Sequence, residues 1–98
     1  MSAFDDVVGF EWDGHNRDKN FIAHGVANEE CEEVFFDPNK KIFEDTIHSE
    51  SENRSILIGC TNARRLLFIV FTLRKSKVRV ISARDLNKRE QKLYEKTT

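Results

Sequence analysis

The stretch that decides the fold is RSILIGCTNARRLLFIVFTLRKSKVRVISA, residues 54–83. It predicts three strands, at 54–60, 65–72 and 77–83, because each segment is rich in apolar, mostly β-branched or aromatic residues between turn-forming ones. The connections TNAR and LRKS are of hairpin length, so neighbouring strands must run antiparallel. The run LLFIVF is apolar at every position, which predicts a central strand that is buried on both faces.

Weaker signals on either side of this stretch complete an α+β fold. Asp13 and Asn87 are N-cap residues at the starts of two predicted helices, and Pro38 prevents the continuation of another. The remaining predicted elements are a short strand at 9–13, helices at about 14–24 and 28–37, a strand at 41–45, a polar connection at 46–53 and a last helix from Asn87. The order β-α-α-β-β-β-β-α predicts two N-terminal helices packed on a four-stranded antiparallel sheet, with a third helix at the C-terminus.

The whole chain has the size and composition of one globular domain, residues 1–98. Of its 98 residues, 34% are charged and 39% are hydrophobic, a balance that does not fit a disordered chain. No apolar run approaches the roughly 20 residues of a membrane-spanning helix. The opening MSAFDDVVGF also lacks the cations and the long apolar run of an export signal. We therefore expect a cytoplasmic protein with no membrane association.

Neither a metal site nor a cofactor site is predicted. Cys31 and Cys60 lack the spacing of a metal or redox motif, and both lie in apolar patterns typical of reduced core residues. The sequence has no Gly-rich phosphate loop, no nucleophile elbow and no H-E-x-x-H motif. The segment DTIHSE (45–50) offers one imidazole and two carboxylates in a polar connection, and a metal hydrolase built on it is an alternative that chelation would test.

The charge is distributed unevenly along the chain, although the net charge is only −1. Residues 1–55 contain 14 acidic and 5 basic residues, a balance of −9, and residues 56–98 contain 3 acidic and 11 basic residues, a balance of +8. The basic half could attract a polyanion such as RNA. Alternatively, the two halves could neutralise each other within the fold, and a purely structural domain would then bind no RNA.

The arginines of the last strand are the first candidates for function. Strand alternation places Arg79 on one face with Ile81 and Ala83, where we expect a core or a covered groove. An arginine there needs a partner, which could be Glu52 or another acid, or a bound phosphate. Arg84 closes the same strand, so the two arginines together predict a phosphate-binding site.

A histidine and a tyrosine could complete such a site. Several cations and one titratable group suffice to cleave RNA without a metal ion, because the 2′-hydroxyl of RNA is itself the nucleophile. His24 stands at a predicted helix C-terminus, where the helix dipole favours its protonated form. The alternative for His24 is a capping or packing role, and Tyr94 could either stack on a base or close the core.

Four segments in order resemble the BrnT family. They are FEWD…N…HG, DTIHSESENR, SILIG…RLLFIVFT and VRVISAR……E…YE, and the resemblance runs from about Phe10 to Glu95. It implies a RelE-like fold and the toxin of a type II toxin–antitoxin system, a metal-independent ribonuclease that halts translation. It also implies neutralisation by BrnA, a ribbon-helix-helix antitoxin, in a 2:2 complex that represses its own operon and contacts DNA through the antitoxin.

The site residues combine this resemblance with the charge argument. The predicted catalytic residues are His24, Arg65, Arg79 and Arg84, and the predicted RNA-binding residues are Lys19, Arg54, Arg89 and Tyr94. Three cations common in the family are replaced, at positions expected to face RNA, by Asn16, Ala23 and Gln91. The alternative is therefore an inactive BrnT-like module that only binds antitoxin and takes part in operon regulation.

Overall fold

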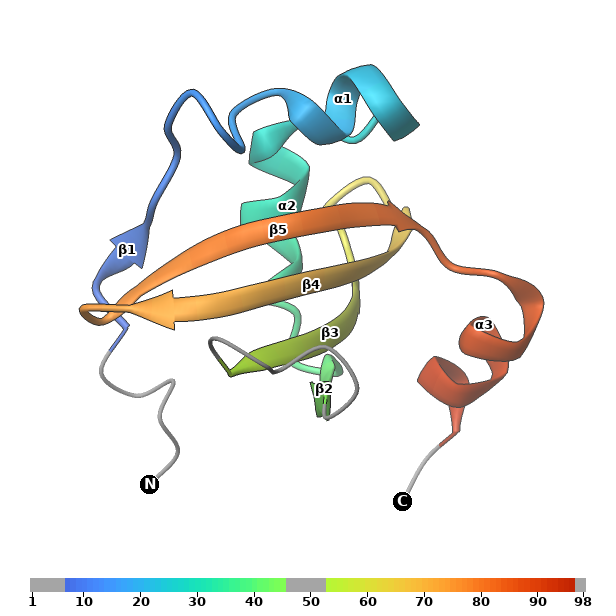
Figure 1. Ribbon diagram of the computed structural model, residues 1–98. Helices are drawn as coiled ribbons and strands as arrows, with labels where there is room; N and C mark the ends of the chain where they lie inside the picture. The colour runs from blue at the N-terminus through green and yellow to red at the C-terminus, as the bar shows by residue number, and fades with distance from the viewer. Residues whose placement is uncertain (1–6, 46–52, 97–98) are drawn as a thin grey trace.

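The computed structural model describes residues 7–45 and 53–96. In this part of the chain, one β-sheet is combined with three short helices (Figure 1). The elements are β1 (Gly9–Phe10), α1 (Lys19–His24), α2 (Asn28–Val34), β2 (Lys41–Asp45), β3 (Arg54–Cys60), β4 (Leu66–Arg74), β5 (Lys77–Asp85) and α3 (Lys88–Glu95). The predicted α+β class and element order are confirmed. None of the helices in the described part is long and apolar enough to cross a membrane.

The sheet has five strands in the order β1-β5-β4-β3-β2. Strands β2 to β5 form the predicted antiparallel meander. The prediction of four strands was wrong by one, because β1 joins the sheet parallel to β5 through the pairs Gly9–Lys77 and Phe10–Val78. A parallel pair between the two ends of the chain is long-range, so no local signal in the sequence indicates it.

A β-bulge interrupts the pairing of β4 with β5. Val70 pairs with Ser82 and Phe71 pairs with Val80, which leaves Ile81 as the extra residue of β5. The inserted residue shifts the alternation, so that Val80 and Ala83 both face the core although three positions separate them. The prediction that Arg79 shares a face with Ala83 was therefore wrong, and Arg79 lies on the opposite face.

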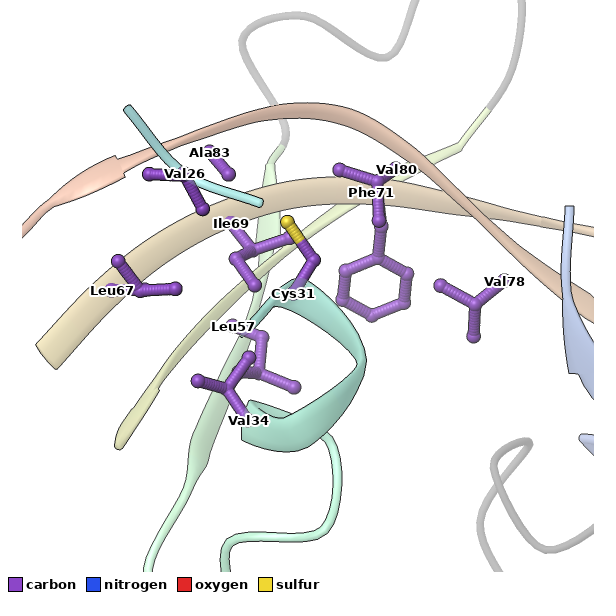
Figure 2. Close-up of a cluster of buried hydrophobic side chains, with 10 residues drawn as sticks. All are labelled: Val26, Cys31, Val34, Leu57, Leu67, Ile69, Phe71, Val78, Val80 and Ala83. Carbon is purple, nitrogen blue, oxygen red and sulfur yellow. The ribbon is translucent and has the colours of Figure 1, made fainter. Parts of the chain in front are cut away.

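The core lies between the sheet on one side and α2 with Val26, in the connection before α2, on the other (Figure 2). Its buried side chains are Val26, Cys31, Val34, Leu57, Leu67, Ile69, Phe71, Val78, Val80 and Ala83. On the other face of β4, Phe68 and Val70 are only half-buried. The prediction that β4 is buried on both faces is therefore correct for one face only. Gly59 allows α2 to pack closely, since a Cβ at this position would lie 3.1 Å from the carbonyl oxygen of Val34.

The two cysteines differ in environment. Cys31 belongs to the core, and its burial raises the pKa of its thiol to about 12. Cys60 ends β3 and is only half-buried, so the prediction of a core position holds for Cys31 and only partly for Cys60. Both are free thiols.

Helices α1 and α2 are shorter than predicted, whereas α3 begins where the sequence predicts it. Residues 14–18 form turns, and Asp18, in a left-handed conformation with φ of 60°, precedes α1 in place of Asp13. The Asp13 carboxylate instead accepts a hydrogen bond of 2.8 Å from the backbone N–H of His15. Helix α3 begins with the expected capping box, in which the side chains of Asn87 and Glu90 each accept from the other's backbone N–H.

Candidate functional site

Three of the predicted site residues lie on one face of the sheet. The register places Ile56, Val70 and Ser82 in one row and Phe68 and Arg84 in another, on the face away from α1 and α2. We call this the second face. Arg54 reaches it by alternation with Ile56, and Arg79 reaches it because it pairs with Thr72, two residues from Val70. The bulge thus allows Arg79 and Arg84, five residues apart, to share a face.

Arg84 is held at one end of the second face. Its guanidinium forms a bidentate pair with Glu90, with distances of 2.7 and 2.8 Å to the two carboxylate oxygens. It also lies over the Phe68 ring, 4.0 Å from the centroid. These partners fix its orientation, and the side chain is still 39% exposed. The hydrogen bond from Arg84 lowers the pKa of Glu90, and the same bond raises the pKa of Arg84.

Arg79 occupies the other end, about 13 Å away along the strand at the usual rise per residue. Its side chain is only 11% exposed. It donates to Glu11 at 2.8 Å and to both carboxylate oxygens of Asp13 at 2.8 and 3.2 Å. The hydrogen bond from Arg79, followed by the bond from the His15 backbone, lowers the pKa of Asp13 to about 2. Arg79 therefore ties the segment after β1 to β5, the pairing with an acid that the sequence left open.

Arg65 lies on the side of the helices, beside His24. Its Nε and Nη2 bind the Asp85 carboxylate at 2.7 and 3.1 Å, and its Nη1 binds Glu30 at 3.1 Å. The same guanidinium donates to the carbonyl oxygens of Gly25 and His24, at 2.9 and 3.3 Å. All five N–H donors of Arg65 are thus engaged. Arg65 fixes the turn after α1, while the side chain of His24 remains exposed.

The end of β5 brings three of the four predicted catalytic residues near one another. Asp85 accepts from Arg65 through its carboxylate and from the adjacent Arg84 through its backbone carbonyl, at 3.1 Å. The Asp85 pKa is lowered, first by the hydrogen bond from Arg65 and also by the charges of Arg65 and His24. His24 and Arg65 therefore lie on the helix side with the Asp85 carboxylate, Arg84 reaches only the Asp85 backbone from the second face, and Arg79 lies apart from all three.

Tyr94 is neither free to stack nor part of the main core. Its hydroxyl donates to Asp37 at 2.6 Å, and Asp37 also accepts from the backbone N–H of Cys60 at 2.8 Å. Burial of the phenol, together with its bond to the Asp37 carboxylate, raises the pKa of Tyr94. Burial alone would raise the pKa of Asp37, but the hydrogen bonds from Tyr94 and two backbone N–H groups outweigh it and lower that pKa. This contact fastens α3 to the chain that follows α2.

The other predicted RNA-binding residues are dispersed. Lys19 starts α1 and donates to the Ile81 carbonyl at 3.4 Å, Arg54 starts β3, and Arg89 is exposed in the first turn of α3. The segment proposed as a weak metal site, 45–50, lies outside the described residues except for Asp45. Within 7–45 and 53–96, no group of three or more His, Cys, Asp or Glu side chains is arranged to hold a metal ion.

Comparison with known families settles the class of the chain. The sequence model of the ribonuclease toxin BrnT of type II toxin–antitoxin systems matches residues 12–90. The chain belongs to the BrnT family. Membership implies an RNA target and an antitoxin partner, and it agrees with the resemblance drawn from the four sequence segments.

A solved BrnT structure shows the same fold. The 1.1 Å crystal structure of the Brucella abortus ribonuclease toxin, BrnT, aligns with a TM-score of 0.61 and 24% sequence identity, covering 84% of this chain and 100% of that one. At this identity the likeness extends to the fold alone. None of the curated proteins matches the sequence significantly.

The structure adds acidic residues to this BrnT site that the sequence did not single out. Glu11, Glu30 and Asp85 bind the predicted catalytic arginines, and for Glu11 and Glu30 the excess of acids in the first half of the chain was the available signal. The pairs of Glu11 with Arg79 and of Glu30 with Arg65 join the two halves, as the alternative of mutual neutralisation expects, whereas Asp85 and Arg65 both belong to the second half. Asn16, expected at an RNA-facing position, is instead 3% exposed and donates to Val80 and Glu11 carbonyls.

Proposed function

We propose that this BrnT-family chain cleaves RNA without a metal ion, at the end of β5 where His24, Arg65 and Arg84 surround Asp85. The observation that carries the proposal is that an exposed His24 and two half-buried arginines lie around Asp85, Arg65 on the helix side of β5 and Arg84 on the second face. A phosphate beside Asp85 on the helix side would meet charge-assisted donors from Arg65, while Arg84 would bind a neighbouring phosphate of the RNA on the second face. Catalytic toxins of this kind need no covalent intermediate, since the RNA supplies its own nucleophile.

Each residue has a definite task in the proposed reaction. The 2′-hydroxyl attacks the adjacent phosphorus, the P–O5′ bond breaks, and a 2′,3′-cyclic phosphate and a 5′-hydroxyl remain. His24 accepts the proton from the 2′-hydroxyl, which requires the neutral imidazole, and the leaving 5′-oxygen takes its proton from water. Arg65 stabilises the extra negative charge that develops on the phosphate oxygens, and Arg84 holds the RNA through a neighbouring phosphate. Because carboxylates already occupy both guanidinium groups, the phosphate competes with Asp85 for Arg65 and with Glu90 for Arg84.

The test is cleavage of end-labelled RNA in excess chelator by the wild-type chain and by His24→Asn. We expect cleavage with a 2′,3′-cyclic phosphate end, slowed roughly 100-fold or more in the variant. His15→Asn is the matched control, since His15 is also exposed and lies outside the cluster. Cleavage by His24→Asn at the wild-type rate would remove His24 from the reaction, and loss of wild-type activity in chelator would contradict the metal-free mechanism.

The proposed cellular role is inhibition of translation in the cytoplasm by RNA cleavage, reversed by a ribbon-helix-helix antitoxin. Support comes from the family, and a 2:2 complex that contacts DNA through the antitoxin is the form that the resemblance implies. Two observations favour the alternative, an inactive module that only binds antitoxin. Ala23 precedes His24 where the family commonly has lysine, and each predicted catalytic arginine is bound by a carboxylate. A wild-type chain that leaves RNA intact would establish that alternative.

A further inference from the structure

The two outer edges of the sheet differ in how their backbone groups are covered. On the β5 side, β1 pairs with the beginning of β5, and side chains near α1 form hydrogen bonds with backbone groups of the rest of β5. Asn16 donates to the carbonyl of Val80 at 3.1 Å, and the amide oxygen of Asn20 accepts from the N–H of Ala83 at 2.9 Å. Asn16 and Asn20 are both 3% exposed, so this edge is closed by buried amides.

The β2 edge shows no such closure within the described residues. There, β2 pairs with β3 on one side only. A groove of about 780 Å³ runs beside it, between Lys40–Phe43 and the last residues of α3, Tyr94–Lys96. Phe43 is 38% exposed. An edge strand beside a groove can accept another strand, which pairs through the backbone and fills the groove with alternate side chains.

The residues of this edge are complementary to themselves. If two copies of the strand pair antiparallel about Ile42, then Lys40 lies opposite Glu44 of the other copy, and this happens twice because the contact is symmetric. The same register sets Ile42 against Ile42, and the stem of Lys41 against the Phe43 ring. The neighbouring symmetric register, about Phe43, would set Ile42 against Glu44. Its charge pairs would join Lys41, whose ammonium already binds the Leu93 carbonyl at 2.6 Å, to the buried Asp45. The register about Ile42 is therefore the better matched.

We propose that β2 is the contact strand of a homodimer, in which two copies pair antiparallel about Ile42 and join their sheets. The contact is isologous, so it closes at two subunits and does not propagate. The dimer gains backbone hydrogen bonds, two interchain ion pairs in all, and the covering of Ile42 and Phe43 in both copies. Dimerisation lies at the sheet edge away from the His24–Arg65–Arg84 cluster, so it does not depend on the proposed ribonuclease activity.

The experiment measures the molar mass of the full chain in solution over a concentration series, by sedimentation or light scattering. The wild type should approach twice 11.5 kDa as concentration rises. Lys40→Glu and Glu44→Lys should each weaken the dimer roughly tenfold, because two attractions become two repulsions. The double variant Lys40→Glu/Glu44→Lys restores opposite charges at both contacts and should recover the wild-type dimer.

Two controls keep this result distinct from misfolding and from general charge effects. Lys75→Glu makes the same charge change in the exposed β4–β5 turn, away from β2, and should leave the dimer unchanged. The thermal midpoint of every variant is measured alongside. A monomeric wild type at all concentrations, or single variants as dimeric as the wild type, would overturn the proposal. So would a double variant that stays monomeric while folding normally.

Discussion

The helix-covered face and the second face of the sheet are built from alternate residues of the same strands, yet they differ in composition. The centre of the first packs apolar side chains against α2, at nearly zero exposure. The second mixes half-buried Ile56, Phe68 and Val70 with Arg79 and Arg84. The difference shows how a small domain separates tasks, since one face supplies the hydrophobic free energy of folding and the other holds the charged groups in fixed positions.

Adjacent residues of β4 test this separation most strongly. Phe71 is fully buried, so Phe71→Ala should lower the free energy of unfolding by about 3–5 kcal/mol. Its neighbour Val70 points to the second face and is half-buried, so Val70→Ala should cost less than about 1.5 kcal/mol. Urea unfolding of the two variants gives both values, and equal losses would mean that the second face is as tightly packed as the first.

Arg84 tests the second face as a site for RNA. Arg84→Gln removes the charge and the donor fork, and we expect RNA cleavage to fall about 100-fold. The stability cost should be about 1 kcal/mol, since the pair with Glu90 is partly exposed and solvent screens it. Arg84→Lys keeps the charge but not the bidentate geometry, so its rate of RNA cleavage should lie between those of the wild type and of Arg84→Gln. If Arg84→Gln cleaved RNA normally, Arg84 would serve only to fasten α3.

The smallest expected effect concerns acid stability at the Arg79 end. The pKa of Asp13 is about 2 in the folded chain and 3.8 ordinarily, so its ion pair stabilises the fold fully above about pH 4 and loses this effect as the pH falls towards 2. Asp13→Asn should flatten the fall of the thermal midpoint in that window. Part of the slope should remain, because the pKa values of Asp85 and Glu90 are lowered too. An unchanged slope would show that Asp13 does not contribute.

The sequence predicts those parts of the fold that depend on neighbouring residues. The bounds of β2 and β3 and the capping box of α3 agree with expectation, because alternation, turns and caps are local signals. The β1–β5 pairing and the bulge at Ile81 depend on contacts between distant segments, and periodicity alone places Arg79 on the wrong face.

The candidate site is predicted in its residues more than in its geometry. Arginine-rich strands indicate an anion site, but nothing in the pattern joins Arg65 to the carbonyl of His24, 41 residues away. The sequence does not predict the carboxylate partners either, because Glu11 and Glu30 come from segments remote from the arginines that they bind. Glu90, the carboxylate partner of Arg84, lies only six residues away, so this pair is local in the sequence.

The parallel pairing of β1 with β5 sets an order of events during synthesis. Strands β2 to β5 can pair with their neighbours as soon as each emerges, whereas Glu11 must wait for Arg79, 68 residues later. At typical elongation rates of roughly 5–20 residues per second, that wait lasts several seconds. The contacts that join the two ends of the sheet are thus the last to form as the chain is made, after the hairpins of β2 to β5.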